Sequence, residues 1–146
     1  MAKKSAKLKD FLDAKVDVYN RVGFIKDDPI SVPHRFTLSQ DIEIAAFFAA
    51  IFSWGNRTTI IQKSRSLMAL MDDAPYAFVT QHQPSDLKRL MAFKHRTFNT
   101  TDLLYFIEFF QQFYATHDSL EEAFLKGYAR GAVRRGADHP ITGALN

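Results

Sequence analysis

Two segments of this chain are apolar on nearly every side, and they constrain its fold more than any other feature. The first runs from Ile44 to Phe52 and the second from Leu103 to Phe113. Each follows residues that favour a helix N-terminus, so each is expected to be a helix. A helix that is apolar all round is enclosed by its neighbours. The sequence therefore predicts an all-α globular helical bundle around two central helices.

The aromatic content makes such a core large enough to be stable. The chain has 14 Phe, five Tyr and one Trp, and each buried ring removes on the order of 150 to 250 Å² from water. The residues expected in the core are Phe47, Phe48, Ile51, Phe106, Phe109 and Phe110.

Apolar spacing predicts six or seven helices in all, over residues 7–21, 39–54, 56–71, 72–79, 85–91, 100–113 and 119–128. Gly23 is expected to end the first helix, and Gly55 to turn the chain in a left-handed conformation. The segment 27–33, with two prolines, is expected to be an ordered loop or a very short strand. Expected N-caps are Thr37 or Ser39, Asn56, Asp72 or Asp73, Ser85, Thr100 or Thr101, and Ser119.

Composition excludes several classes of protein. The chain has no Cys, which rules out disulfides, a thiol nucleophile and cysteine-ligated zinc and indicates a reducing compartment. The N-terminus lacks the apolar run of a signal peptide, and the longest apolar stretch is far shorter than the ~18 residues of a membrane span. We expect a cytoplasmic protein with no membrane association. The net charge of +3 weakly favours an anionic partner.

No motif for a catalytic or cofactor site is present. The sequence lacks a phosphate loop, a dinucleotide glycine fingerprint, a serine nucleophile elbow and a zinc-protease helix. The five histidines lack ligand spacing, and adjacent acids such as Asp72 and Asp73 cannot face one point from a helix. We therefore expect no cofactor and no metal, and the catalytic residues, if there are any, are unknown.

The loop from Ser53 to Thr59 is the most informative candidate site. Arg57 and the amides after Asn56 could hold a phosphate at a helix N-terminus, and Trp54 could stack on a base. In the alternative interpretation, which we favour, Trp54 packs in the core and Asn56 caps a helix.

Two His-Arg pairs precede predicted central helices, at His34–Arg35 and His95–Arg96. Arg35 and Arg96 could each contact an anion through the guanidinium fork. Structural roles, in which each Arg holds a loop carbonyl or pairs with an acid such as Asp41 or Asp102, are the favoured alternative.

A family resemblance rests on five blocks of sequence between residues 8 and about 125. The blocks are residues 28–36, 41–45, 54–57, 75–79 and 95–99. They resemble an uncharacterised family of conserved bacterial proteins that is common in Bacteroidetes. Residues 131–146 depart from the pattern of that family.

Members of that family are usually longer, and their second half is similar to part of the helix-hairpin-helix DNA glycosylase fold of the endonuclease III superfamily. The layout of Ile51 to Trp54, followed by Asn56 and Arg57, resembles the helix pair that faces DNA there. The resemblance implies that the hairpin and the catalytic Lys and Asp lie beyond residue 146.

The sequence thus favours a single helical domain over residues 1–146, which could be the N-terminal part of a longer protein. This domain would contribute a DNA-binding surface to a glycosylase-like DNA repair protein. The DNA-binding residues would be Arg35, Trp54, Asn56, Arg57 and Arg96. A helical protein-interaction or structural module, with another protein or a missing C-terminal half as its partner, is the alternative. An enzyme acting on a small molecule ranks third.

Overall fold

Helices make up nearly all of the regular structure in this computed structural model, which describes residues 2–125, with side chains from Lys7 onward. The α-helices are α1 (Ala2–Tyr19), α2 (Val22–Ile25), α3 (Ser39–Ile51), α4 (Arg57–Leu70), α5 (Pro75–Gln81) and α6 (Thr100–Tyr114). The 3-10 helices are η1 (Pro29–Ser31), η2 (Pro33–Arg35) and η3 (Asp86–Leu90). Residues 2–125 contain no strand, and a single bridge joins His95 to Phe98. The predicted all-α fold is confirmed.

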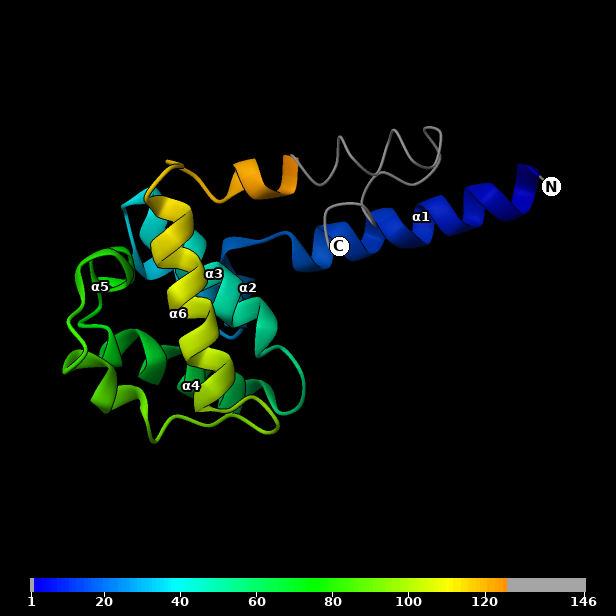
Figure 1. The fold of residues 1–146 in the computed structure, drawn as a ribbon. Helices are drawn as coiled ribbons and strands as arrows, with labels where there is room; N and C mark the ends of the chain where they lie inside the picture. Colours follow the sequence, from blue (N-terminus) through cyan, green and yellow to red (C-terminus); the bar gives the residue numbers. More distant parts are fainter. Residues whose placement is uncertain (1, 126–146) are drawn as a thin grey trace.

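The centre of the molecule is the crossing of α3 and α6 (Figure 1). Both are largely apolar, as predicted, and they meet through aromatic rings: Phe48 lies 5.8 Å from Phe110 and Phe47 lies 5.0 Å from Phe106, between ring centroids. Edge-to-face pairs of this kind add to the free energy gained by burial. α4 and α5 also contact α3 and complete the core.

The predicted core residues separate into three groups. Phe48 and Phe110 are fully buried, and Phe47 and Phe106 are partly buried against the core. The prediction was wrong for Ile51 and Phe109, which are 38% and 36% exposed. They lie on the outward sides of α3 and α6, so an apolar sequence on all faces did not mean complete enclosure.

One predicted N-cap is confirmed, and the helix predicted from residue 72 begins later than expected. The Asn56 side chain accepts a hydrogen bond from the Thr59 amide at 3.1 Å and caps α4, and Pro75 occupies the first position of α5. The cap of α6 is Asn99, in a capping box with Asp102, rather than Thr100 or Thr101.

Other predicted caps are wrong, in most cases because the side chain takes part in a tertiary contact or the helix starts elsewhere. No side chain caps α3: Ser39 lies inside it, and the Gln40 amide donates to the Asp118 carbonyl, 78 residues away. Likewise, Asp72 and Asp73 bond to arginines instead of capping α5, and Ser85 makes no cap bond to η3.

The N-terminal region also differs from expectation. α1 ends at Tyr19, and Gly23 lies inside the short helix α2 rather than ending α1. Pro29 and Pro33 begin the 3-10 helices η1 and η2, where a loop or strand was expected. α1 extends away from the other helices (Figure 1). Its apolar residues are about half exposed, namely Leu8, Phe11, Leu12, Val16, Val18 and Tyr19.

Glu43 connects three parts of the chain through one carboxylate. It accepts hydrogen bonds from Tyr114 Oη at 2.8 Å, from Ser119 Oγ and from the Leu120 amide at 2.9 Å. The hydrogen bonds from Ser119 and Leu120 attach the start of the final helical segment to α3. This segment continues through residues 121–125.

Ser119 was predicted to cap this segment, and its hydroxyl accepts a hydrogen bond from the Glu121 amide. The predicted extension to Tyr128 lies outside the described residues.

No helix among the described residues is long and apolar enough to cross a membrane.

The first prediction concerns the core. Phe48→Ala should lower the free energy of unfolding by about 3 to 5 kcal/mol, because it leaves a ring-sized cavity. Phe109→Ala should cost roughly 1 kcal/mol or less, because the Phe109 ring is partly solvated already. Urea denaturation, read from the midpoint at unchanged slope, measures both. Equal losses at the two positions would show that the outer side of α6 is covered in solution.

A second prediction concerns pH. Burial and the hydrogen bond to Glu43 raise the pKa of Tyr114 above its ordinary value. A raised pKa means that the folded protein holds this proton more tightly than the unfolded chain does. The resulting stability is present below about pH 10, the ordinary pKa of tyrosine, and it is lost as the pH rises above that value. Urea midpoints between pH 8 and 11 should fall more steeply for the wild type than for Tyr114→Phe. Parallel curves would contradict this.

Candidate functional site

The turn between α3 and α4 is held by local hydrogen bonds. The Ser53 hydroxyl donates to the Ala49 carbonyl at 2.6 Å, and the Trp54 amide donates to the Phe52 carbonyl at 2.7 Å. Gly55 follows with φ +113°, a conformation that other residues rarely adopt. The prediction that this glycine turns the chain is confirmed. Trp54 is 42% exposed, so it does not pack in the core as the favoured interpretation held.

A second turn, at residues 95–98, lies against the first. His95 is buried, and its Nε2 lies 3.2 Å from the Phe52 carbonyl oxygen. Because a carbonyl only accepts, Nε2 must donate, and this bond fixes the turn to the end of α3. Arg96 comes next with φ +56°, a left-handed conformation that is strained for a residue with a side chain.

Arg96 bridges the two turns. Its guanidinium lies over the Trp54 ring, 5.0 Å from the centroid. It also occupies the space beside Gly55, where a Cβ would collide with it. The structure therefore brings Trp54 and Arg96, two predicted site residues separated by 41 positions in the sequence, into one contact. We call Trp54, Gly55 and Arg96 the clasp.

Two surface hollows are lined by residues of α4. The first is lined by Lys26, Asp27, Arg57, Thr58, Ile61, Gln62 and Arg65. The second is lined by Arg35, Gln62, Arg65, Ser66 and Ala69. Because Gln62 and Arg65 line both, the hollows adjoin each other. Their cations, Lys26, Arg57, Arg65 and Arg35, form what we call the basic row.

The cations of the basic row differ in their partners. Arg57 lies over the Phe24 ring at 6.0 Å. Neither Arg57 nor Arg65 pairs with a carboxylate in the described part of the chain. Lys26 lies 4.0 Å from Asp27, and Arg35 donates to Asp73 at 3.1 Å. The two arginines at the middle of the row therefore make no ion pair in the described structure, although Asp27 lines the same hollow.

The structure brings some of the predicted site residues together and shows what the others contact. Arg96 and Trp54 meet at Gly55, Asn56 and Arg57 begin α4, and Arg35 lies beyond Arg65. Asn56 uses its side chain to cap α4, the role that the alternative interpretation gave it. Arg35 pairs with an acid, as its alternative proposed, but with Asp73 rather than Asp41. Asp102 bonds the Asn99 amide, not Arg96.

Sequence reasoning missed Lys26 and Arg65. The four-residue steps from Arg57 to Ile61 and Arg65 place these residues on one side of a helix, so Arg65 could have been found. Lys26 could not, since only the packing of the N-terminal segment brings it to α4.

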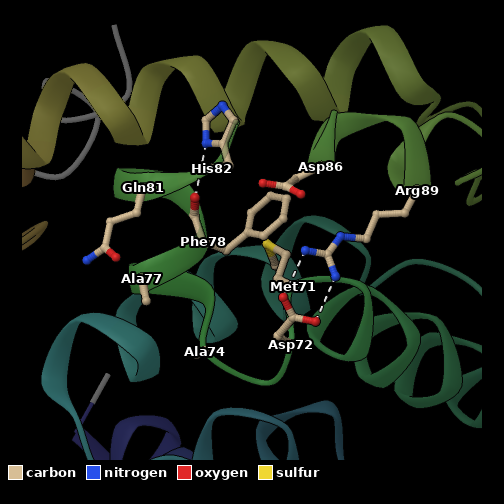
Figure 2. Close-up of a pocket in the computed structure, with 9 residues that line it drawn as sticks. All are labelled: Met71, Asp72, Ala74, Ala77, Phe78, Gln81, His82, Asp86 and Arg89. Carbon is tan, nitrogen blue, oxygen red and sulfur yellow. Dashed lines mark hydrogen bonds and ion pairs between the residues drawn. The ribbon is translucent and has the colours of Figure 1, made fainter. Parts of the chain in front are cut away.

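A separate hollow lies between α5 and η3 (Figure 2). There Arg89 donates through Nη1 and Nη2 to both carboxylate oxygens of Asp72, at 2.7 and 2.8 Å, and lies over the Phe78 ring. The hydrogen bond from Arg89 lowers the pKa of Asp72. Asp72 therefore stays ionised and satisfied, which suits it to fixing the loop before α5 rather than to transferring protons.

The described residues contain no group of three or more His, Asp or Glu side chains that could hold a metal ion.

The clasp yields a third prediction. Gly55→Ala should destabilise the protein by about 1 to 3 kcal/mol, through backbone strain at positive φ and displacement of Arg96 from Trp54. In an Arg96→Ala background the same change should cost less, because the collision is gone. Urea unfolding of the two single variants and the double variant measures the coupling, and Trp54, the sole tryptophan, reports it by fluorescence. Additive losses would show that Arg96 does not occupy the glycine site.

Comparisons with known proteins give a family and no function. A search of curated proteins and a search of solved structures each returned no significant match. A family model described as a protein of unknown function, DUF2400, matches residues 28–143. The match includes most of residues 131–146, which had been expected to depart from the family pattern, and it leaves out α1 and α2. The chain therefore belongs to the DUF2400 family of proteins of unknown function.

Proposed function

We propose that this chain binds nucleic acid, with the basic row contacting backbone phosphates and the clasp lying at one end of the contact surface. The observation that carries the proposal is the pair of adjoining hollows on α4, which share Arg65 and also contain Arg57, Lys26 and Arg35. A polyanion is the partner expected of a line of cations with few close acids.

Arginine suits this role because its planar guanidinium can donate two parallel hydrogen bonds to phosphate oxygens. Arg57 and Arg65 are exposed, and eight helical residues separate them by about 12 Å along α4. They are therefore able to contact different phosphates. Binding of this kind is strongly dependent on salt and largely independent of sequence.

The resemblance of longer family members to DNA glycosylases makes DNA repair the biological setting that we propose. No catalytic step is part of the proposal for this chain, because its sequence carries no motif for a catalytic site. The purified chain should accordingly release no base from damaged duplexes.

A protein-interaction module is the second candidate function, and one specific observation favours it. Six large apolar residues of α1 are half exposed, and most of the stability of a protein helix comes from tertiary packing of its apolar face. A partner that covers this face would stabilise α1. The two candidate functions use different surfaces, so they can be tested separately.

The fourth prediction compares Arg57→Ala and Arg65→Ala with Lys88→Ala, an exposed cation on η3 that lies outside the basic row. All three remove one positive charge. Fluorescence anisotropy with a labelled 20-nucleotide DNA should show that each arginine change weakens binding and reduces the slope of log affinity against log salt by about 0.7 to 0.9. Lys88→Ala should leave the slope unchanged, and thermal melting should be similar for all three.

Two outcomes would reject the nucleic-acid proposal. One is no detectable binding by the wild-type chain at low salt, where electrostatic attraction is strongest. The other is an equal effect of all three variants, which would mean that only net charge matters. Loss of melting temperature in Arg57→Ala would instead indicate that its contact with Phe24 is structural.

A further inference from the structure

We propose that the clasp makes this surface selective for single-stranded nucleic acid, with one base stacked on Trp54 while the adjoining phosphates lie along the basic row. The inference rests on the proposed function and deepens it by naming the form of nucleic acid. It is carried by the position of the one exposed indole beside unpaired arginines.

Trp54 has the exposure that a stacking platform needs. It is 42% exposed, although a large aromatic ring gains free energy when it is covered. The Arg96 guanidinium lies over one side of the ring, and His95 meets it edge-on, with centroids 6.3 Å apart and the planes at 83°. The contacts at the ring thus hold its orientation and leave a large part of its surface open to a further flat group.

The contacts that position Trp54 are unusually constrained. Arg96 adopts φ +56° and Gly55 adopts φ +113°, and the guanidinium fits only because position 55 has no Cβ. Glycine adopts positive φ at little cost, but the left-handed conformation of Arg96 costs free energy and persists only where surrounding structure fixes it. Here the buried His95 and its hydrogen bond to Phe52 fix the turn, so the ring and the guanidinium are oriented before any ligand binds.

Charge and stacking lie next to each other along the chain. Trp54 is three residues before Arg57, which belongs to the basic row. Aromatic rings beside a cationic groove are the usual arrangement for binding single strands, since every base offers a face on which to stack. In a duplex those faces are already stacked on one another, and inserting a ring between them costs a few kcal/mol per step. The same surface should therefore prefer a single strand.

The test measures the affinity of the full chain for three labelled 12-mers, namely oligo-dT, oligo-U and a DNA duplex. We expect both single strands to bind at least about tenfold more tightly than the duplex and to quench the fluorescence of Trp54. Comparison of the two single strands shows whether the site distinguishes DNA from RNA. Trp54→Ala should weaken single-strand binding between about fivefold and about 150-fold, the range that base stacking gives, and should not change the salt slope.

Two further variants provide controls. Trp54→Phe, which keeps an aromatic face, should retain most of the affinity for oligo-dT. Tyr105→Ala removes a different exposed aromatic residue, on α6, and should have no effect.

Different outcomes separate this inference from the proposed function. Equal affinity for duplex and single strand, or full affinity in Trp54→Ala, would overturn the stacking inference and leave phosphate binding intact. No binding of any of the three 12-mers at low salt would overturn both.

Discussion

The aromatic contact between α3 and α6 is the interaction on which the rest of the structure depends. Phe48 lies at its centre, fully buried, with ring neighbours in Phe52 on its own helix and in Phe106 and Phe110 on α6. The same ring system extends through Phe52 to His95, and so fixes where α3 ends and where the 95–98 turn rests. The position of Trp54 on the surface is therefore a consequence of packing in the core.

The arginines of this chain serve two physical purposes. Arg89 and Arg35 bond to Asp72 and Asp73, two adjacent residues that both have positive φ, and these bonds hold the loop before α5 in its strained conformation. Arg57, Arg65 and Arg96 make no ion pair with a carboxylate in the described structure. A charge without an internal partner contributes little to folding but remains available to an external anion. This difference supports nucleic-acid binding at α4 and a structural role for the hollow at α5.

Much of the fold could be predicted because its signals are local. Apolar periodicity located the main helices, and Asn56 caps α4 as expected. The errors occurred where distant residues compete for the same side chain. No side chain caps α3, where Thr37 or Ser39 was expected, and Gln40 in its first turn bonds to Asp118. Phe109 is exposed because no described element covers that side of α6. A single sequence carries no information about such competition between residues far apart in the chain.

By itself the sequence determined the helical class and the turn at Gly55, and it pointed to some residues of the candidate site, because backbone conformation and side-chain chemistry are properties of short segments. Only the tertiary structure decided which of these residues meet. It placed Arg96 over Trp54 and Gly55, and brought Lys26 and Arg35 to either end of a row along α4. The physical reason is that a binding surface depends on distances between elements, and core packing sets those distances without leaving a pattern in the local sequence.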